Sequence, residues 1–159
     1  MKTSVPQVLE EVEKQQTKEG KIRILRSYDN QVLRGILKLN FDHSIKMDLP
    51  PGEPPFKKDI SLPEGYSESN LFVEFRRFYI WLDPTKNITK LRKESLFIQM
   101  LEGMHWKESE LVCLAKDKKI QTKYKSVTHE LVDEAFPNFL PPKPVEEKKP
   151  KKAKVPLKE

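Results

Sequence analysis

Hydrophobic residues recur at helical spacing in the first third of the chain and predict three amphipathic helices there. The first ends near residue 16, and its apolar positions follow the i, i+3, i+4, i+7 pattern. Ser4 with Gln7 forms a capping-box pattern at its start. Thr17 can cap the second helix, and Asp29 or Asn30 the third. The apolar residues that define these helices are Val5, Val8, Leu9, Val12, Ile22, Leu25, Val32, Leu33, Ile36 and Leu37.

A long irregular segment interrupts the helical pattern. Residues 49–70 hold five prolines and two glycines, a composition typical of a functional or mobile loop. Ser69 or Asn70 can cap the helix that follows. The helices expected after the loop cover residues 71–82, 87–104, 107–116 and 127–136. The residues assigned to the buried face of the first are Leu71, Phe72, Phe75, Phe78, Tyr79 and Leu82.

The pattern contains no clean strand period and no internal repeat. We therefore expect an all-α fold, a single compact bundle of about seven helices formed by residues 1–141, with the Pro-rich loop at 48–70. Residues 142–159 are rich in lysine and proline and offer almost nothing to bury, which predicts a flexible basic tail. Cys113 lies between apolar neighbours and is expected to be a small core residue.

Charge modifies this picture only locally. The chain has a formal net charge of +6, and the seven lysines and three glutamates of residues 141–159 supply +4 of it. The helical body is therefore nearly balanced, so any basic surface on it must be local. No apolar run approaches the ~18 residues of a membrane span. A single cysteine excludes an internal disulfide and fits a reducing cytoplasm, so we expect a soluble intracellular protein.

Catalytic and metal-binding signals are weak. His43, His105 and His129 lack the spacing of a metal-binding motif. The sequence has no phosphate-binding glycine loop of the GxxxxGK type and no GxSxG motif. Its carboxylates are interpreted as helix-surface charges, none in a context that would shift its pKa. We therefore expect no enzyme activity, no metal and no cofactor.

Clusters of basic residues carry more information. The densest is "KDKKIQTKYKSVT" (residues 116–128), followed at once by a predicted helix whose N-terminal amides and dipole suit a phosphate group. The residues alone leave open that these lysines simply occupy a solvated turn. The predicted main contacts are Lys116, Lys118, Lys119, Lys123, Lys125, Ser126 and Thr128. A second candidate patch is Lys86, Lys90, Arg92 and Lys93, a weaker one is Arg34 and Lys38, and Arg76 and Arg77 form a further basic pair.

Two stretches of the chain resemble the all-helical N-terminal DNA-binding domain of ATP-dependent DNA ligases, in the form found in T4-like phages. The first is "VLEEVEKQQTKEGKIRILRSYDNQVLRGILKLNFD", which is similar to the family's opening three helices. The second is "ESELVCLAKDKKIQTKYKSVTHELVDEAFPNFLP", which is similar to its helix–turn–helix and ends in the same aromatic-Pro-x-x-Leu/Ile-Pro pattern. The resemblance covers both ends of residues 5–141 but not the middle.

Two departures from the ligase pattern limit what the resemblance implies. The ligase turn usually has a glycine that lets the backbone approach a phosphate, whereas this sequence has none after Gly103. The nucleotidyl-transfer signature Lys-x-Asp-Gly is also absent, and Lys46-Met47-Asp48-Leu49 comes nearest without the glycine. The resemblance thus implies a non-catalytic accessory protein, similar to proteins of T4-like phages, that acts in the host cytoplasm. It would bind double-stranded DNA through phosphate contacts, without strong sequence specificity.

An interaction adaptor is the alternative interpretation. The Pro-rich loop and the basic tail are peptide-like segments able to become ordered on a protein partner. Such a partner would belong to the replication or transcription machinery, or the protein would be a component of the virion. A partner that survives nuclease and high salt would favour this alternative over DNA binding.

Overall fold

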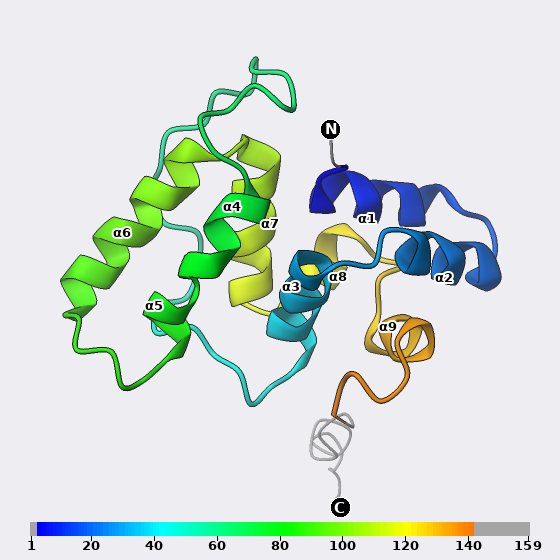
Figure 1. The fold of residues 1–159 in the computed structure, drawn as a ribbon. Helices are drawn as coiled ribbons and strands as arrows, with labels where there is room; N and C mark the ends of the chain where they lie inside the picture. Colours follow the sequence, from blue (N-terminus) through cyan, green and yellow to red (C-terminus); the bar gives the residue numbers. More distant parts are fainter. Residues whose placement is uncertain (1–2, 142–159) are drawn as a thin grey trace, which may run out of the picture.

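The computed structural model describes residues 3–141, which form helices and connecting segments without a β-strand (Figure 1). The predicted all-α fold is therefore confirmed for this part of the chain. The predicted tail, residues 142–159, lies outside the described residues. The helical elements are α1 (Val5–Lys14), α2 (Lys18–Ser27), α3 (Gln31–Phe41), α4 (Leu71–Glu74), the 3₁₀ turn η1 (Phe75–Arg77), α5 (Tyr79–Leu82), α6 (Lys90–Gly103), α7 (Trp106–Lys116), α8 (Ile120–Lys123) and α9 (His129–Ala135).

Local hydrogen bonds start the first three helices where the sequence predicts. Ser4 and Gln7 form a reciprocal capping box at α1. The Thr17 side chain accepts a hydrogen bond from the Gly20 amide at 3.0 Å and caps α2. Asn30 caps α3 by accepting from the Leu33 amide at 2.8 Å. Because Asn30 takes the cap, the neighbouring Asp29 is left to pair with a basic side chain of α3.

The prediction of a single helix over residues 71–82 is wrong, because the segment divides into α4, η1 and α5. Asn70 caps it, accepting from the Val73 amide at 3.1 Å. The 3₁₀ turn lies where the ring of Phe75 packs against Gly35 of α3. A Cβ added to Gly35 would lie 2.1 Å from Phe75 Cζ, so only glycine permits this close approach of the two elements.

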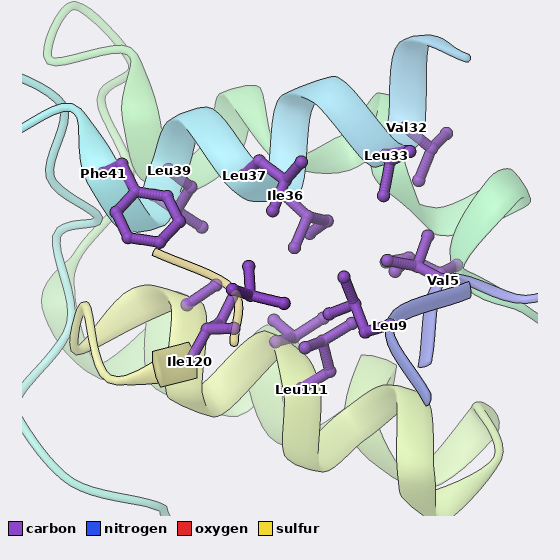
Figure 2. Packing of buried hydrophobic residues seen from close by; sticks show 14 of the residues in the cluster. Val5, Leu9, Val32, Leu33, Ile36, Leu37, Leu39, Phe41, Leu111 and Ile120 are labelled. Atoms are coloured by element: carbon purple, nitrogen blue, oxygen red, sulfur yellow. The ribbon is translucent and has the colours of Figure 1, made fainter. Parts of the chain in front are cut away.

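The core lies between α3 and α7, with α1 and α8 closing it. Figure 2 shows Leu9 of α1, Ile36 of α3, and Leu111 of α7 directed toward one another, with Ile120 of α8 beside them. These four side chains are buried. Cys113 is buried in the same cluster, and burial raises the pKa of its thiol to about 12. The prediction that Cys113 is a core residue is thus confirmed.

Residues 42–70 cross the molecule without helix or strand (Figure 1). Hydrogen bonds join this segment to α6 and to the end of α7. The Gly52 amide donates to the Asp117 carboxylate at 3.0 Å. The Lys57 amide donates to the Glu102 carboxylate at 2.9 Å. The Ser69 amide donates to the Gly103 carbonyl at 2.8 Å. These contacts hold the segment across the ends of α6 and α7.

None of the helices in residues 3–141 is long and apolar enough to cross a membrane. The same residues contain no group of three or more His, Cys, Asp and Glu side chains placed to hold a metal ion.

Candidate nucleic-acid interface

The lysine-rich turn begins with a side chain that is buried. Lys116 ends α7, and its ammonium group donates to the carbonyls of Pro50 and Gly52 at 2.9 and 3.0 Å and to the Asp117 carboxylate at 2.8 Å. All three ammonium hydrogens are used within the protein. The prediction that Lys116 contacts phosphate is therefore wrong, because its charge holds the Pro-rich segment to the end of α7.

Lys118 terminates α7 in a way that turns its side chain inward. Its φ of 62° is left-handed, a conformation usually taken by glycine. The amides of Lys118 and Lys119 donate to the carbonyls of Ala115 and Leu114 at 3.1 and 2.8 Å, which is the pattern of a Schellman motif. A lysine thus takes the left-handed position that glycine usually occupies at the end of a helix.

The Lys118 ammonium group binds carbonyl groups at the C-terminal end of α3. It donates to the carbonyls of Leu39, Asp42 and Ile45 at 2.6, 3.1 and 2.7 Å, at the C-terminus of α3 and in the segment that follows. The last carbonyls of a helix lack partners within it, so a cation there is stabilising. Burial lowers the pKa of Lys118. The prediction that Lys118 contacts phosphate is also wrong.

The predicted phosphate site at the start of the last helix is already filled by the protein itself. The Ser126 amide donates to the Glu13 carboxylate at 2.7 Å, and the Thr128 hydroxyl accepts from the Leu131 amide at 3.1 Å as the cap of α9. The Lys123 ammonium pairs with Glu110. Within residues 3–141, only Lys119 and Lys125 among the five lysines predicted in this turn have neither an ion pair nor a hydrogen bond from the ammonium group. The predicted seven residues therefore do not form one phosphate-binding surface.

The second predicted patch also contains both buried and exposed cations. Lys93 is buried, and its ammonium group lies 2.8 Å from the Asp48 carboxylate. Lys90 is exposed and lies 3.4 Å from the same carboxylate. Arg92 is exposed and has no ion pair among the described residues. The prediction for Lys93 is wrong, while Lys90 and Arg92 remain on the surface at the start of α6.

Next to these cations, the structure exposes an aromatic ring that the hydrophobic pattern assigns to the core. Tyr79 is 51% exposed, whereas Phe78, just before α5, and Ile80, within it, are buried. The Lys86 ammonium lies 5.1 Å from the centre of the Tyr79 ring, within the range of a cation–π contact. Arg76, which lies in η1 three residues before Tyr79, is exposed as well.

These side chains come from η1, α5, the 83–89 linker and the start of α6, which follow one another along the chain at one end of the molecule (Figure 1). We refer to them as the Tyr79 patch. Asp48 and Asp83 lie nearby, and Asp83 is bound by the hydroxyl of Thr85 at 2.7 Å. The first turn of α6 carries no acidic residue. The members of the Tyr79 patch are Arg76, Tyr79, Lys86, Lys90 and Arg92.

The weakest predicted patch is occupied by contacts with the C-terminal segment. Arg34 binds the Asp29 carboxylate through two bonds of 2.6 and 2.8 Å, and this pairing lowers the pKa of Asp29. Its guanidinium also lies 4.4 Å from the centre of the Phe136 ring. The Lys38 ammonium lies 5.5 Å from the Phe139 ring. Both cations thus hold α3 against the segment around α9, and a role of Arg34 in binding phosphate stays a prediction.

Glu108 contradicts the expectation that every carboxylate is a surface charge. It lies in the first turn of α7, is 4% exposed, and both its oxygens lie 3.3 Å from the Leu71 amide. Burial raises the pKa of Glu108 to about 7, the Leu71 amide opposes the shift, and Glu64 adds to it. The polar context "HWKESE" gives no sequence signal for a buried acid, because burial is imposed by α4, far along the chain.

The fold and its surface define a small helical protein with a single core and a local basic patch. A model of a family of unknown function (DUF6433) matches residues 8–122, so the chain belongs to this family. The match includes the Tyr79 patch and Glu108 and ends inside the lysine-rich turn. No curated protein and no solved structure matches the chain.

Proposed function

We propose that the protein binds double-stranded DNA through its phosphate backbone, without strong sequence specificity, and that the Tyr79 patch makes the main contact. The observation that carries the proposal is the Lys86 ammonium above a half-exposed tyrosine, with Arg76 and Arg92 exposed nearby. Arginine, lysine and tyrosine side chains all bind phosphate oxygens in protein–DNA complexes. The resemblance to ligase DNA-binding domains supports the same function, although the contact surface differs from the one it implies.

The charge distribution explains why a local patch matters. Residues 3–141 carry a formal net charge of only +1, because Lys2 and residues 142–159 account for +5 of the total. Attraction of the helical body to DNA therefore depends on where its cations face. If the four cations of the Tyr79 patch neutralise about four phosphates, log affinity falls with log salt at a slope of roughly −3.6.

A binding titration with variants of the full-length chain tests this proposal. The patch variant Arg76→Gln/Lys86→Gln/Arg92→Gln is expected to bind a fluorescent 20-base-pair duplex about tenfold or more weakly, for every sequence tried. The matched control is Lys119→Gln/Lys123→Gln/Lys125→Gln, which removes the same charge from the turn and is expected to weaken binding less than threefold. Equal losses in the two variants would mean that net charge alone determines the affinity.

A protein-interaction adaptor is the second candidate function. It is favoured by Ile60 and Tyr66 in the 42–70 segment, which are each 73% exposed. Large apolar side chains on a Pro-rich loop are suited to contact with a protein partner. A partner that remains bound after nuclease and high salt, and is lost in Ile60→Ser/Tyr66→Ser, would favour the adaptor over DNA binding.

A further inference from the structure

A cavity of about 470 Å³ lies between the start of α1, the 64–73 segment and the start of α7. Its wall combines acidic, polar and apolar groups. The end of α1 that contributes to it lies beside α4 and α7 in the fold (Figure 1). Its lining includes Glu64, Val73, His105 and Glu108.

Glu108 is the chemically unusual group in this cavity. A carboxylate offers about four lone-pair positions for hydrogen bonds. Here the two oxygens share one donor, the Leu71 amide, at 3.3 Å from each. No lysine or arginine of residues 3–141 lies within 4 Å of them. A carboxylate that is only 4% exposed is ordinarily paired with a cation or with several donors.

The neighbouring groups do not supply this cation. The Nδ1 of His105 accepts from the Lys107 amide at 3.1 Å, so its Nε2 carries the proton and donates to the Leu62 carbonyl at 2.9 Å. Both ring nitrogens are thus engaged by main-chain groups. The Lys107 ammonium is drawn to Glu10 at 3.4 Å and Glu64 at 3.9 Å. The cavity thus contains one under-coordinated buried carboxylate and a second carboxylate at its edge.

We propose that this cavity binds a primary ammonium group, with Glu108 as its counter-ion and Glu64 as a second acceptor. An ammonium group has three hydrogen-bond donors, which match the unused lone pairs of Glu108. The aliphatic stem of the ligand would lie against Val73. Two sources share this chemistry: a small aliphatic amine, and the lysine side chain of a protein partner.

The proposal includes a proton balance. Burial holds the pKa of Glu108 at about 7, so at pH 6 most molecules carry a neutral Glu108 carboxylic acid. Binding of a cation stabilises the carboxylate, and the proton of Glu108 leaves to the solvent. Affinity should then rise about tenfold between pH 6 and pH 8, as the ionised fraction increases. Glu10, Glu64, Lys107 and His105 are the other titratable groups around the cavity.

Calorimetric titration of the full-length protein tests this assignment. The probes are cadaverine and the peptide acetyl-Gly-Lys-Gly-amide, with the same peptide acetylated at the lysine as the neutral control. We expect one or both cations to bind, with release of close to one proton at pH 6, measured as a dependence of the heat on the buffer. Binding of cadaverine indicates a small-amine ligand, and binding of the lysine peptide alone indicates a partner side chain.

The matched variants are Glu108→Gln and Glu68→Gln, which remove one negative charge inside and outside the cavity. The amide introduced by Glu108→Gln keeps an oxygen that can accept from the Leu71 amide, so the local fold should persist. Glu108→Gln is expected to reduce the affinity at pH 8 at least tenfold, and Glu68→Gln less than twofold. Binding that is unchanged in Glu108→Gln overturns the proposal. So does the absence of binding or of proton release in the unaltered protein, a result that does not depend on any variant.

Discussion

The turn between α7 and α9 and the Tyr79 patch both contain closely spaced cations, but the two regions use them in opposite ways. In the turn, the ammonium groups of Lys116 and Lys118 donate to carbonyls of the 42–52 segment and of α3. In the Tyr79 patch, Arg76 and Arg92 remain exposed without an ion pair among the described residues. The lysines of the turn therefore stabilise the fold, whereas the exposed cations of the Tyr79 patch can contact a partner.

The physical difference lies in what surrounds each cation. Helix α3 ends beside the turn and the Pro-rich segment runs past it, and both present carbonyl groups that have no partner in a helix or sheet. A lysine stem is long enough to reach them while its methylene groups stay against apolar surface. Among residues 3–141, no cation of the Tyr79 patch donates to a carbonyl, and Arg76, Lys86, Lys90 and Arg92 are all exposed. Lysine density along a sequence is therefore a poor measure of surface charge.

The largest effect on this comparison is expected from Lys118→Met. Methionine keeps much of the apolar stem but removes three bonds to the carbonyls of Leu39, Asp42 and Ile45. Bonds from charged donors contribute about 1.5–3 kcal/mol each, and partial access of water reduces the sum, so we expect a loss of about 3–4 kcal/mol. Urea unfolding measures it.

Two control variants separate the causes of that loss. Lys86→Met in the Tyr79 patch removes an exposed ammonium group and should cost less than about 0.5 kcal/mol. Lys118→Gly removes the same three bonds and also the apolar stem, but it relieves the left-handed backbone of a non-glycine residue, so it should cost about as much as Lys118→Met. Equal destabilisation by Lys118→Met and Lys86→Met would contradict the contrast between the two regions.

The same contrast between inward and outward charges holds for the acids of α7, and Glu108→Gln tests it. The pKa of Glu108 is about 7 in the folded protein, against about 4.5 when unfolded. Between these values the folded state binds more protons, so stability is full below pH 4.5 and is lost as pH rises through 7. At about 1.4 kcal/mol per pKa unit, glutamine should stabilise the protein by about 3 kcal/mol at pH 8.

At pH 4.5 the same substitution should be nearly neutral, because the folded protein then carries Glu108 in its uncharged form. Glu110→Gln, which removes a partly exposed partner of Lys123 and Lys58 on α7, should change stability by less than about 1 kcal/mol at either pH. Thermal unfolding from pH 4.5 to pH 8 gives both curves. A Glu108→Gln protein whose stability depends on pH as strongly as that of the unaltered protein would show that another group titrates.

A smaller effect is expected from Arg34→Gln, which tests whether Arg34 belongs with the structural cations of the turn or with the Tyr79 patch. Arg34 binds Asp29 through two bonds, and its guanidinium stacks on Phe136. Its side chain is partly exposed, so we expect a loss of about 1 kcal/mol in urea unfolding. DNA affinity should change less than twofold. A tenfold loss of affinity with unchanged stability would place Arg34 in the DNA-binding surface.

The helix caps could be predicted from the sequence because their partners are local. Ser4 and Gln7 are three residues apart, and Thr17 and Asn30 bind amides three residues further on. The roles of Lys118 and Glu108 could not be predicted, because their partners lie 79 and 37 residues earlier in the chain. The assignment of Tyr79 to the core is wrong, since adjacent aromatic residues in a short helix cannot all face inward. Tertiary contacts thus decide which charges and rings remain on the surface.

The salt dependence of duplex binding, compared between the Tyr79 patch variant and the turn variant, separates the two regions most sharply. We predict that Arg76→Gln/Lys86→Gln/Arg92→Gln flattens the slope of log affinity against log salt by about 2.7. Lys119→Gln/Lys123→Gln/Lys125→Gln should change the slope by less than about 1. Removing residues 142–159 should lower the affinity of both variants and leave the difference between them intact. A larger loss of slope in the turn variant, or no difference between the two, would contradict a DNA contact centred on Tyr79.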